Sequence, residues 1–182
     1  MASVAALRCP THHRWRAMDF EHTNRLLEFG FSGGIRISAL QVSCDTAPTE
    51  RGVYLVVRES NQPVCFLEAS TGGYFKNKNP SVPVSMLEDH WLAKPKVLYV
   101  GKAGGTANQT TIRERMRSFM QFGLGRRCAH WGGRYIWQLA DAKELAVYWK
   151  PLLLEEPRQV EKALLCAFVE KYGQLPFANL KK

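Results

Sequence analysis

The stretch that decides the fold is Gly52-Val53-Tyr54-Leu55-Val56-Val57, together with a second run at residues 97–101, Val-Leu-Tyr-Val-Gly. β-Branched and aromatic residues fill both runs, and such residues favour strands. Residues 59–63 are polar and end in proline, as is typical of a turn, and the second run ends in glycine. We therefore expect two tyrosine-bearing strands and a further short strand at residues 64–67.

The rest of the chain supplies helices and more strands around these runs. Apolar residues recur at helical spacing over residues 158–171, and Gly173 is placed to end that helix. Thr111 and Glu114 have the spacing of a capping box, so a helix should begin there and reach about residue 122. The other elements that we expect are a helix at about residues 19–30, an extended segment at 33–40, a short helix at 84–92, and strands at 135–139 and 145–149. This irregular alternation predicts an α+β fold, a small sheet flanked by helices.

The positive charge is confined to the later part of the chain. The 182 residues carry 25 Lys and Arg against 16 Asp and Glu, a net charge of +9, which favours an anionic partner such as nucleic acid. Bases and acids balance within residues 1–50, so the whole excess follows them. We expect an N-terminal extension at 1–50, disordered over 1–17, and one domain at 51–182.

Cysteine usage and hydropathy indicate the class of protein. The five cysteines are odd in number and include no CxxC pair, so neither a disulfide framework nor a zinc site is indicated. No apolar run approaches the length of a transmembrane helix, and the first residues lack the apolar core of a signal peptide. We expect reduced thiols in a cytoplasmic protein without a membrane partner.

The order of several short motifs is more specific than any one of them. Gly52-Val53-Tyr54 and Tyr99-Val100-Gly101 are followed by Lys102, an Arg113-x-Arg115-x-Arg117 repeat, a helix that opens with Glu161, and Pro176-Phe177-Ala178-Asn179. In this order the motifs resemble those of the GIY-YIG nuclease superfamily, over residues 52–179. The resemblance implies a small, mainly antiparallel sheet flanked by helices, and an endonuclease that depends on Mg²⁺ or Mn²⁺ and cleaves nucleic acid. We expect the substrate to be DNA rather than RNA.

The resemblance also implies roles for single residues. Tyr54 and Tyr99 match the two motif tyrosines, Arg115 the catalytic arginine, and Glu161 the metal-binding carboxylate. Asn179 matches the asparagine that braces the site, and Lys102 a lysine that is functional in some members. Arginine donates paired hydrogen bonds to phosphate, and one carboxylate suffices for a Mg²⁺ ion that keeps its waters. A tyrosine needs a nearby cation to activate water, because its ordinary pKa is near 10; Tyr54 is the first choice for this base, although the sequence leaves the choice between the tyrosines open.

A basic, aromatic segment lies between the arginine repeat and the glutamate helix. His130 lies within it and is either an acid–base residue or a loop histidine packed on Trp131. The arginines expected to bind nucleic acid are Arg113, Arg117, Arg126, Arg127 and Arg134. On a helix, Arg113 and Arg117 share one face, which leaves Arg115 on another.

Two features leave alternatives open. Residues 58–96 separate the motif tyrosines as an insertion, which is either a target-reading element or a lid. Each matched residue also has an ordinary structural explanation, because strand tyrosines pack in cores and a first-turn glutamate favours the helix dipole. The rival functions are a non-catalytic nucleic-acid-binding module with the same fold, and a basic interaction protein with no nucleic-acid role.

Overall fold

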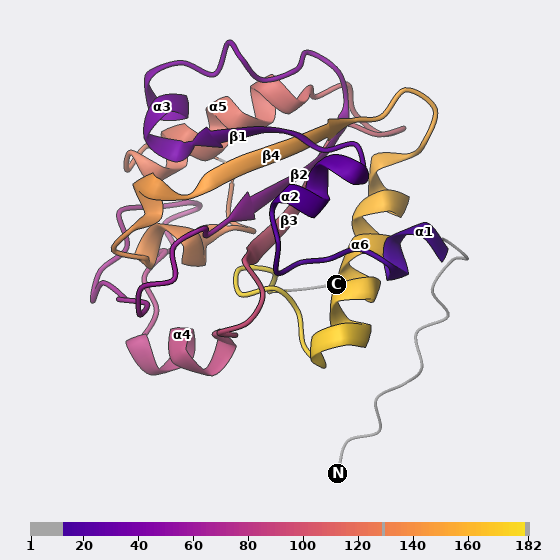
Figure 1. Cartoon of the computed structure of the whole chain (residues 1–182). Helices are drawn as coiled ribbons and strands as arrows, with labels where there is room; N and C mark the ends of the chain where they lie inside the picture. Colours follow the sequence, from indigo (N-terminus) through magenta and orange to yellow (C-terminus); the bar gives the residue numbers. More distant parts are fainter. Residues whose placement is uncertain (1–12, 129, 181–182) are drawn as a thin grey trace.

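The structure, a computed structural model, describes residues 13–128 and 130–180. One four-stranded sheet has the order β1-β4-β2-β3, and every neighbouring pair is antiparallel (Figure 1). The strands are β1 (Ser32–Arg36), β2 (Gly52–Val57), β3 (Val97–Ala103) and β4 (Ala146–Pro151). The helices are α1 (His13–Arg16), α2 (Asn24–Glu28), α3 (Ile37–Val42), α4 (Val84–His90), α5 (Ile112–Gly123) and α6 (Pro157–Tyr172), with 3-10 turns η1 (Arg134–Gln138) and η2 (Ala142–Glu144). The predicted α+β fold is confirmed.

Helices cover both faces of the sheet, and the alternation along β2 explains why. Tyr54 and Val56 point into a core shared with α3, α5 and η1. Val53, Leu55 and Val57 point the other way, into a second core with α1, α2 and α6. Successive side chains of a strand face opposite sides, and here both sides are buried, so the whole of β2 is apolar. Tyr54 therefore lies on the α5 face.

The predicted elements with strong local signals are present. β2 covers the expected residues, and β3, β4, α4, α5 and α6 lie where strands and helices were predicted. The capping box at α5 is formed, because the Thr111 hydroxyl accepts the Glu114 N–H while Glu114 accepts the Thr111 N–H. Gly173 ends α6 with φ of 78°, a conformation that glycine adopts without strain.

Two predicted strands are wrong. Residues 64–67 contribute only an isolated bridge between Phe66 and Leu139, and residues 135–139 fall mostly within the 3-10 helix η1. Tyr135, Ile136, Trp137 and Gln138 are all buried, so this segment is enclosed on every side and needs no alternation. The Gln138 side chain bonds to the backbone of residues 67 and 82, which anchors the insertion to the core.

The N-terminal region also differs from the prediction. The expected helix at 19–30 is restricted to α2, and the expected extended segment at 33–40 is strand β1 followed by α3. β1 pairs with β4 and forms an edge of the sheet, so residues 32–36 belong to the main fold. Predicted disorder over 1–17 falls partly outside the described residues; within them it is wrong, because α1 is formed and Trp15 is buried at 1% exposure.

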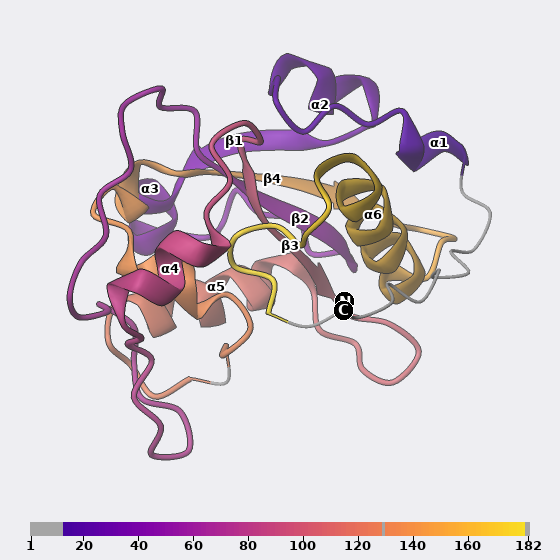
Figure 2. The same cartoon turned by 90° about the horizontal axis from the view of Figure 1, so that it is seen from below.

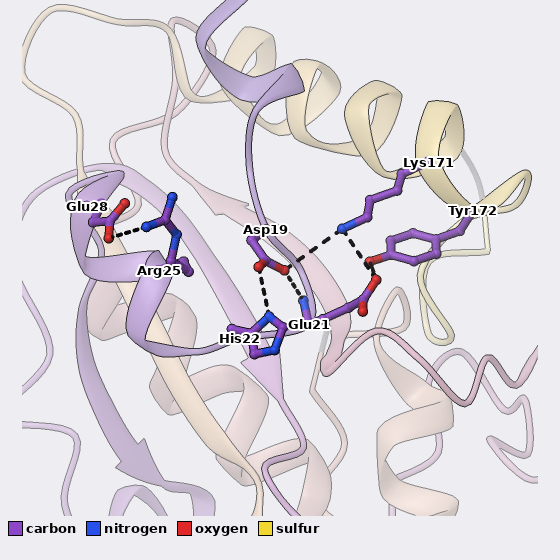
Figure 3. Close-up of polar contacts among 7 residues, drawn as sticks. All are labelled: Asp19, Glu21, His22, Arg25, Glu28, Lys171 and Tyr172. Carbon is purple, nitrogen blue, oxygen red and sulfur yellow. Dashed lines mark hydrogen bonds and ion pairs between the residues drawn. The ribbon is translucent and has the colours of Figure 1, made fainter.

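Charged side chains fasten the N-terminal segment to the end of α6 (Figure 3). The Tyr172 hydroxyl donates to Glu21 at 2.9 Å, and the Lys171 ammonium lies 3.3 Å from Glu21 and 3.9 Å from Asp19. His22 Nδ1 lies 2.8 Å from the same Asp19 carboxylate. This cluster ties a segment near the start of the chain to one near its end.

The insertion at 58–96 crosses the surface as a long loop that includes α4 near its end (Figure 2). Its start is held by Arg58, which is 7% exposed and donates to Asp141 at 2.6 Å and to the Gln62 carbonyl at 2.8 Å. Within the part of the chain that the structure describes, no helix is both long and apolar enough to cross a membrane. Three cysteines, Cys44, Cys65 and Cys128, are free, whereas Cys166 is disulfide-bonded, so the expectation of reduced thiols is wrong there.

Candidate active site

A cleft of about 680 Å³ opens where β3, α6 and the C-terminal segment meet. β3 is the edge strand of the sheet, so this side is not covered by a further strand of the sheet. The lining includes three of the predicted site residues, Tyr99, Glu161 and Asn179, from three different elements. Lys78, Trp131 and Arg134 also line the cleft.

The two motif tyrosines pack against each other on β2 and β3. Their ring centroids lie 5.9 Å apart, and Tyr54 pairs across the strands with Gly101. A Cβ atom at position 101 would lie 2.4 Å from Cζ of Tyr54, closer than any such contact allows. Glycine at position 101 therefore leaves the space that the Tyr54 ring occupies. Tyr54 has no exposed surface, whereas Tyr99 is 6% exposed and reaches the cleft.

Burial keeps both tyrosine hydroxyls protonated near neutral pH. For Tyr54 it raises the pKa, and the charge and hydrogen bonding of Arg115 and a hydrogen bond with Tyr99 offset only part of this effect. For Tyr99, burial and the neighbouring Tyr54 raise the pKa well above its ordinary value. A free tyrosinate base is therefore disfavoured, and a hydroxyl that passes a proton onward fits the site better.

Arg115 lies on the inner face of α5. Burial acts to lower the pKa of its guanidinium, but the two tyrosines and Glu161 outweigh burial and raise it. Its charge acts in turn on Tyr54, Tyr99 and Glu161. Arg115 thus sits electrostatically among the predicted site residues.

His130 is fully buried beside Tyr54. Its Nε2 lies 3.5 Å from the Tyr54 hydroxyl, and its ring stacks on Phe119 at a centroid distance of 4.5 Å rather than on Trp131. Burial, together with the charge of Arg115, lowers its pKa well below the ordinary value of 6.5. The imidazole is therefore neutral at neutral pH, and one of its nitrogens is free to accept a proton.

Glu161 lies on the first turns of α6 and faces the cleft. Burial raises the pKa of this carboxyl, and Lys102, Arg115 and Arg158 act in the opposite direction. The Glu161 carboxylate makes no hydrogen bond or ion pair to any residue that the structure describes. Lys102 follows Gly101 on β3 and is half-buried.

The site offers a single carboxylate as a possible metal ligand. Within residues 13–128 and 130–180, no group of three or more His, Cys, Asp or Glu side chains could hold a metal ion. Glu161 alone fits Mg²⁺ or Mn²⁺, because these ions take hard oxygen ligands and Mg²⁺ commonly keeps several waters. A zinc or other soft-ligand site does not fit these donors.

Asn179 fixes the backbone of β3 next to Tyr99. Its side-chain oxygen accepts the Val100 N–H at 2.9 Å, and its side-chain nitrogen donates to the Val100 carbonyl at 2.8 Å. The Ala178 N–H donates to the Leu98 carbonyl, so the C-terminal segment runs along the β3 edge. Asn179 therefore holds the strand that carries Tyr99 and Gly101.

The five arginines expected to bind nucleic acid lie in three different settings. Arg113 donates to the carbonyls of Asp45 and Ala47, and Arg117 to the Asp45 carboxylate, so these two hold the segment before β2. Arg126 and Arg127 are exposed on the loop after α5. Arg134 alone of the five lines the cleft.

Some residues at the site carried no sequence signal. Lys78 lines the cleft from within the insertion, and nothing in its local Asn-Lys-Asn context indicates where the loop folds back. Gly132 lies close enough to Tyr99 that a Cβ atom there would be 3.1 Å from the hydroxyl. The glycine pair at 132–133 indicates close packing, but the sequence does not show which residue packs there.

Comparisons of the chain with protein-family models, with curated proteins and with solved structures find no match. Any functional conclusion therefore depends on the geometry of these residues.

Proposed function

We propose that this chain is a divalent-metal-dependent endonuclease of the GIY-YIG type, which hydrolyses phosphodiester bonds in nucleic acid, and that its substrate is DNA rather than RNA. One observation carries the proposal. Tyr54, Tyr99, Arg115 and Glu161 come from four different elements and gather beside one cleft. A set of packing residues has no reason to gather with an arginine and a carboxylate at an open edge of a sheet.

The charges suit an in-line attack on a phosphodiester. As the water oxygen forms its bond to phosphorus and the bond to the leaving oxygen breaks, negative charge builds up on the phosphate oxygens. Arg115 would neutralise that charge, because its surroundings keep its guanidinium protonated. Glu161 would hold a divalent cation, which would supply further neutralisation and lower the pKa of bound water.

The proton of the attacking water needs an acceptor, and we assign this role to the neutral imidazole of His130. Its lowered pKa makes it a weak base, so it would hold the proton only while the negative charge of the transition state lies nearby. The Tyr99 hydroxyl faces the cleft, hydrogen bonding links it to Tyr54, and Tyr54 lies 3.5 Å from His130 Nε2. The proton can pass from water to Tyr99, from Tyr99 to Tyr54, and from Tyr54 to His130. Each tyrosine gains one proton and gives one up, so neither becomes charged, as their raised pKa values require.

A plasmid-nicking assay with Mg²⁺ or Mn²⁺, repeated with EDTA, tests the proposal. Glu161→Gln and Arg115→Lys should each lower the cleavage rate by about 100-fold or more. The matched controls are Glu170→Gln, on α6, and Arg36→Lys, on β1, because both residues lie in exposed ion pairs. Both controls should cleave at the wild-type rate.

Two outcomes would overturn the proposal or its roles. Binding without cleavage of any DNA or RNA substrate would favour the non-catalytic binding module. Full activity of Glu161→Gln or Arg115→Lys would show that cleavage does not depend on these residues.

A further inference from the structure

Arg134 is a half-buried cation without an acidic partner. Its guanidinium lies over the rings of Trp131, at 4.7 Å from the centroid, and Tyr135, at 5.0 Å. The Nε atom is shielded from solvent without a hydrogen-bond acceptor, and no carboxylate within the described ranges pairs with the side chain. Burial of a guanidinium is costly unless an anion compensates it. The aromatic rings fix the orientation of the group, and its free edge lines the cleft.

A turn of the insertion brings a second cation to the same wall. Phe75 and Lys78 exchange backbone hydrogen bonds around Lys76 and Asn77, which both have left-handed φ values, 51° and 59°. The Phe75 ring packs against Trp131 at 6.4 Å, so the turn is attached to the segment that carries Arg134. Figure 2 shows this loop projecting from the body of the protein beyond α4. Two consecutive residues with positive φ are the usual geometry of a two-residue type I′ hairpin turn.

The charges of the wall call for an anion. Lys78 and Arg134 line the cleft with a single carboxylate, Glu161, and neither cation forms an ion pair with it or with another described residue. A planar guanidinium and an ammonium in one cleft match the oxygens of a phosphate, and the Trp131 ring holds the guanidinium in its orientation. Arg115 lies on α5 and serves a different place in the site.

We infer that Arg134 and Lys78 form a second phosphate subsite, which binds a phosphodiester next to the one that is cleaved. The identity of this ligand as part of a polynucleotide rests on the proposed function. The insertion then binds the substrate through Lys78, and Trp131 orients Arg134.

Binding of a fluorescein-labelled DNA duplex, measured by anisotropy in EDTA over a series of salt concentrations, tests the subsite without cleavage. Each lost phosphate contact should lower the slope of log K against log salt by about 0.9. Arg134→Gln and Lys78→Gln should each show this loss, with weaker binding at every salt concentration. The matched controls are Arg36→Gln and Lys143→Gln, which remove the same charge from exposed positions outside the cleft. Their slopes should equal that of the wild type.

The outcomes separate this inference from the proposed function. An unchanged slope in both variants would overturn the subsite, even if the protein cleaves DNA. If the wild type does not cleave DNA but the variants show the expected decrease in the salt slope, only the proposed nuclease activity is overturned. If Arg134→Gln weakens binding of a mononucleotide as much as it weakens binding of the duplex, the residues bind a small ligand and the inference is overturned. If Arg134→Gln fails to fold, Lys78→Gln decides, because its side chain is exposed on the turn.

Discussion

Substitution of Gly101 by alanine tests whether the two motif strands are built around the Tyr54 ring. The new Cβ atom would lie 2.4 Å from Cζ and 2.5 Å from the hydroxyl of Tyr54, and the ring is fully buried. The Tyr54 ring must therefore shift. Overpacking of this kind costs about 1–3 kcal/mol, which for a chain of this size lowers Tm by about 2–12 °C.

The same shift should affect cleavage more than stability. Tyr54 contacts both Tyr99 and His130, so movement of its ring would disrupt the proposed proton path. A misplacement of about 1 Å costs about 100-fold in rate. Thermal unfolding and plasmid nicking are measured on the same preparation, and the variant should remain folded at the assay temperature while its rate falls.

Gly133→Ala is the matched control, because it lies in the same site without a clash. Its Cβ atom would be 3.4 Å from the Phe119 ring and 3.5 Å from Cζ of Tyr99, which is ordinary contact. In the double variant Gly101→Ala with Tyr54→Leu, the loss of unfolding free energy should be smaller than the sum of the two single losses by about 0.5–3 kcal/mol. Additive destabilisation, or wild-type Tm for Gly101→Ala, would refute the reasoning.

Other changes test the hydrogen bonds of Asn179 to β3, the polar contacts between the N-terminal segment and α6, and the role of His130. Asn179→Ala leaves two buried backbone groups of β3 without partners, at about 1–3 kcal/mol each; a Tm within error of wild type would contradict the bracing role. Burial acts to raise the pKa of Asp19, but the Glu21 N–H, His22 and Lys171 outweigh burial and lower it. The pKa of Glu21 is lowered by its hydrogen bond from Tyr172 and by Lys171, which together outweigh burial. Stability from this pair is therefore present above the ordinary carboxylate pKa and lost as pH falls through the lowered values, and Lys171→Met should flatten the dependence of the urea midpoint on acid pH. Because burial lowers the pKa of His130, the cleavage rate should stay level as pH falls through the usual histidine range and drop only below it; a midpoint near 6.5 would contradict a buried proton acceptor.

Local signals in the sequence were enough for the elements near the site. The β-rich runs predicted β2 and β3, and the Thr111–Glu114 spacing predicted where α5 begins, because strand propensity and helix capping depend on neighbouring residues. Helical spacing also separated Arg115 from Arg113 and Arg117, which bond to residues 45–47 in the structure. The strand predicted at 135–139 was wrong because β-prone side chains also suit a short helix that is buried on all sides.

The sequence by itself determined the fold class, the charge that favours a polyanion, and the ordered set of tyrosine, arginine, glutamate and asparagine that resembles a nuclease. Only the tertiary structure decided how these residues meet. It buried Tyr54 and His130 together, left Tyr99 at the cleft, and brought Lys78 from the insertion to Arg134. These contacts join residues far apart in the chain, and they depend on packing around a shared core and on burial of charge. Neither is encoded in the spacing of neighbouring residues.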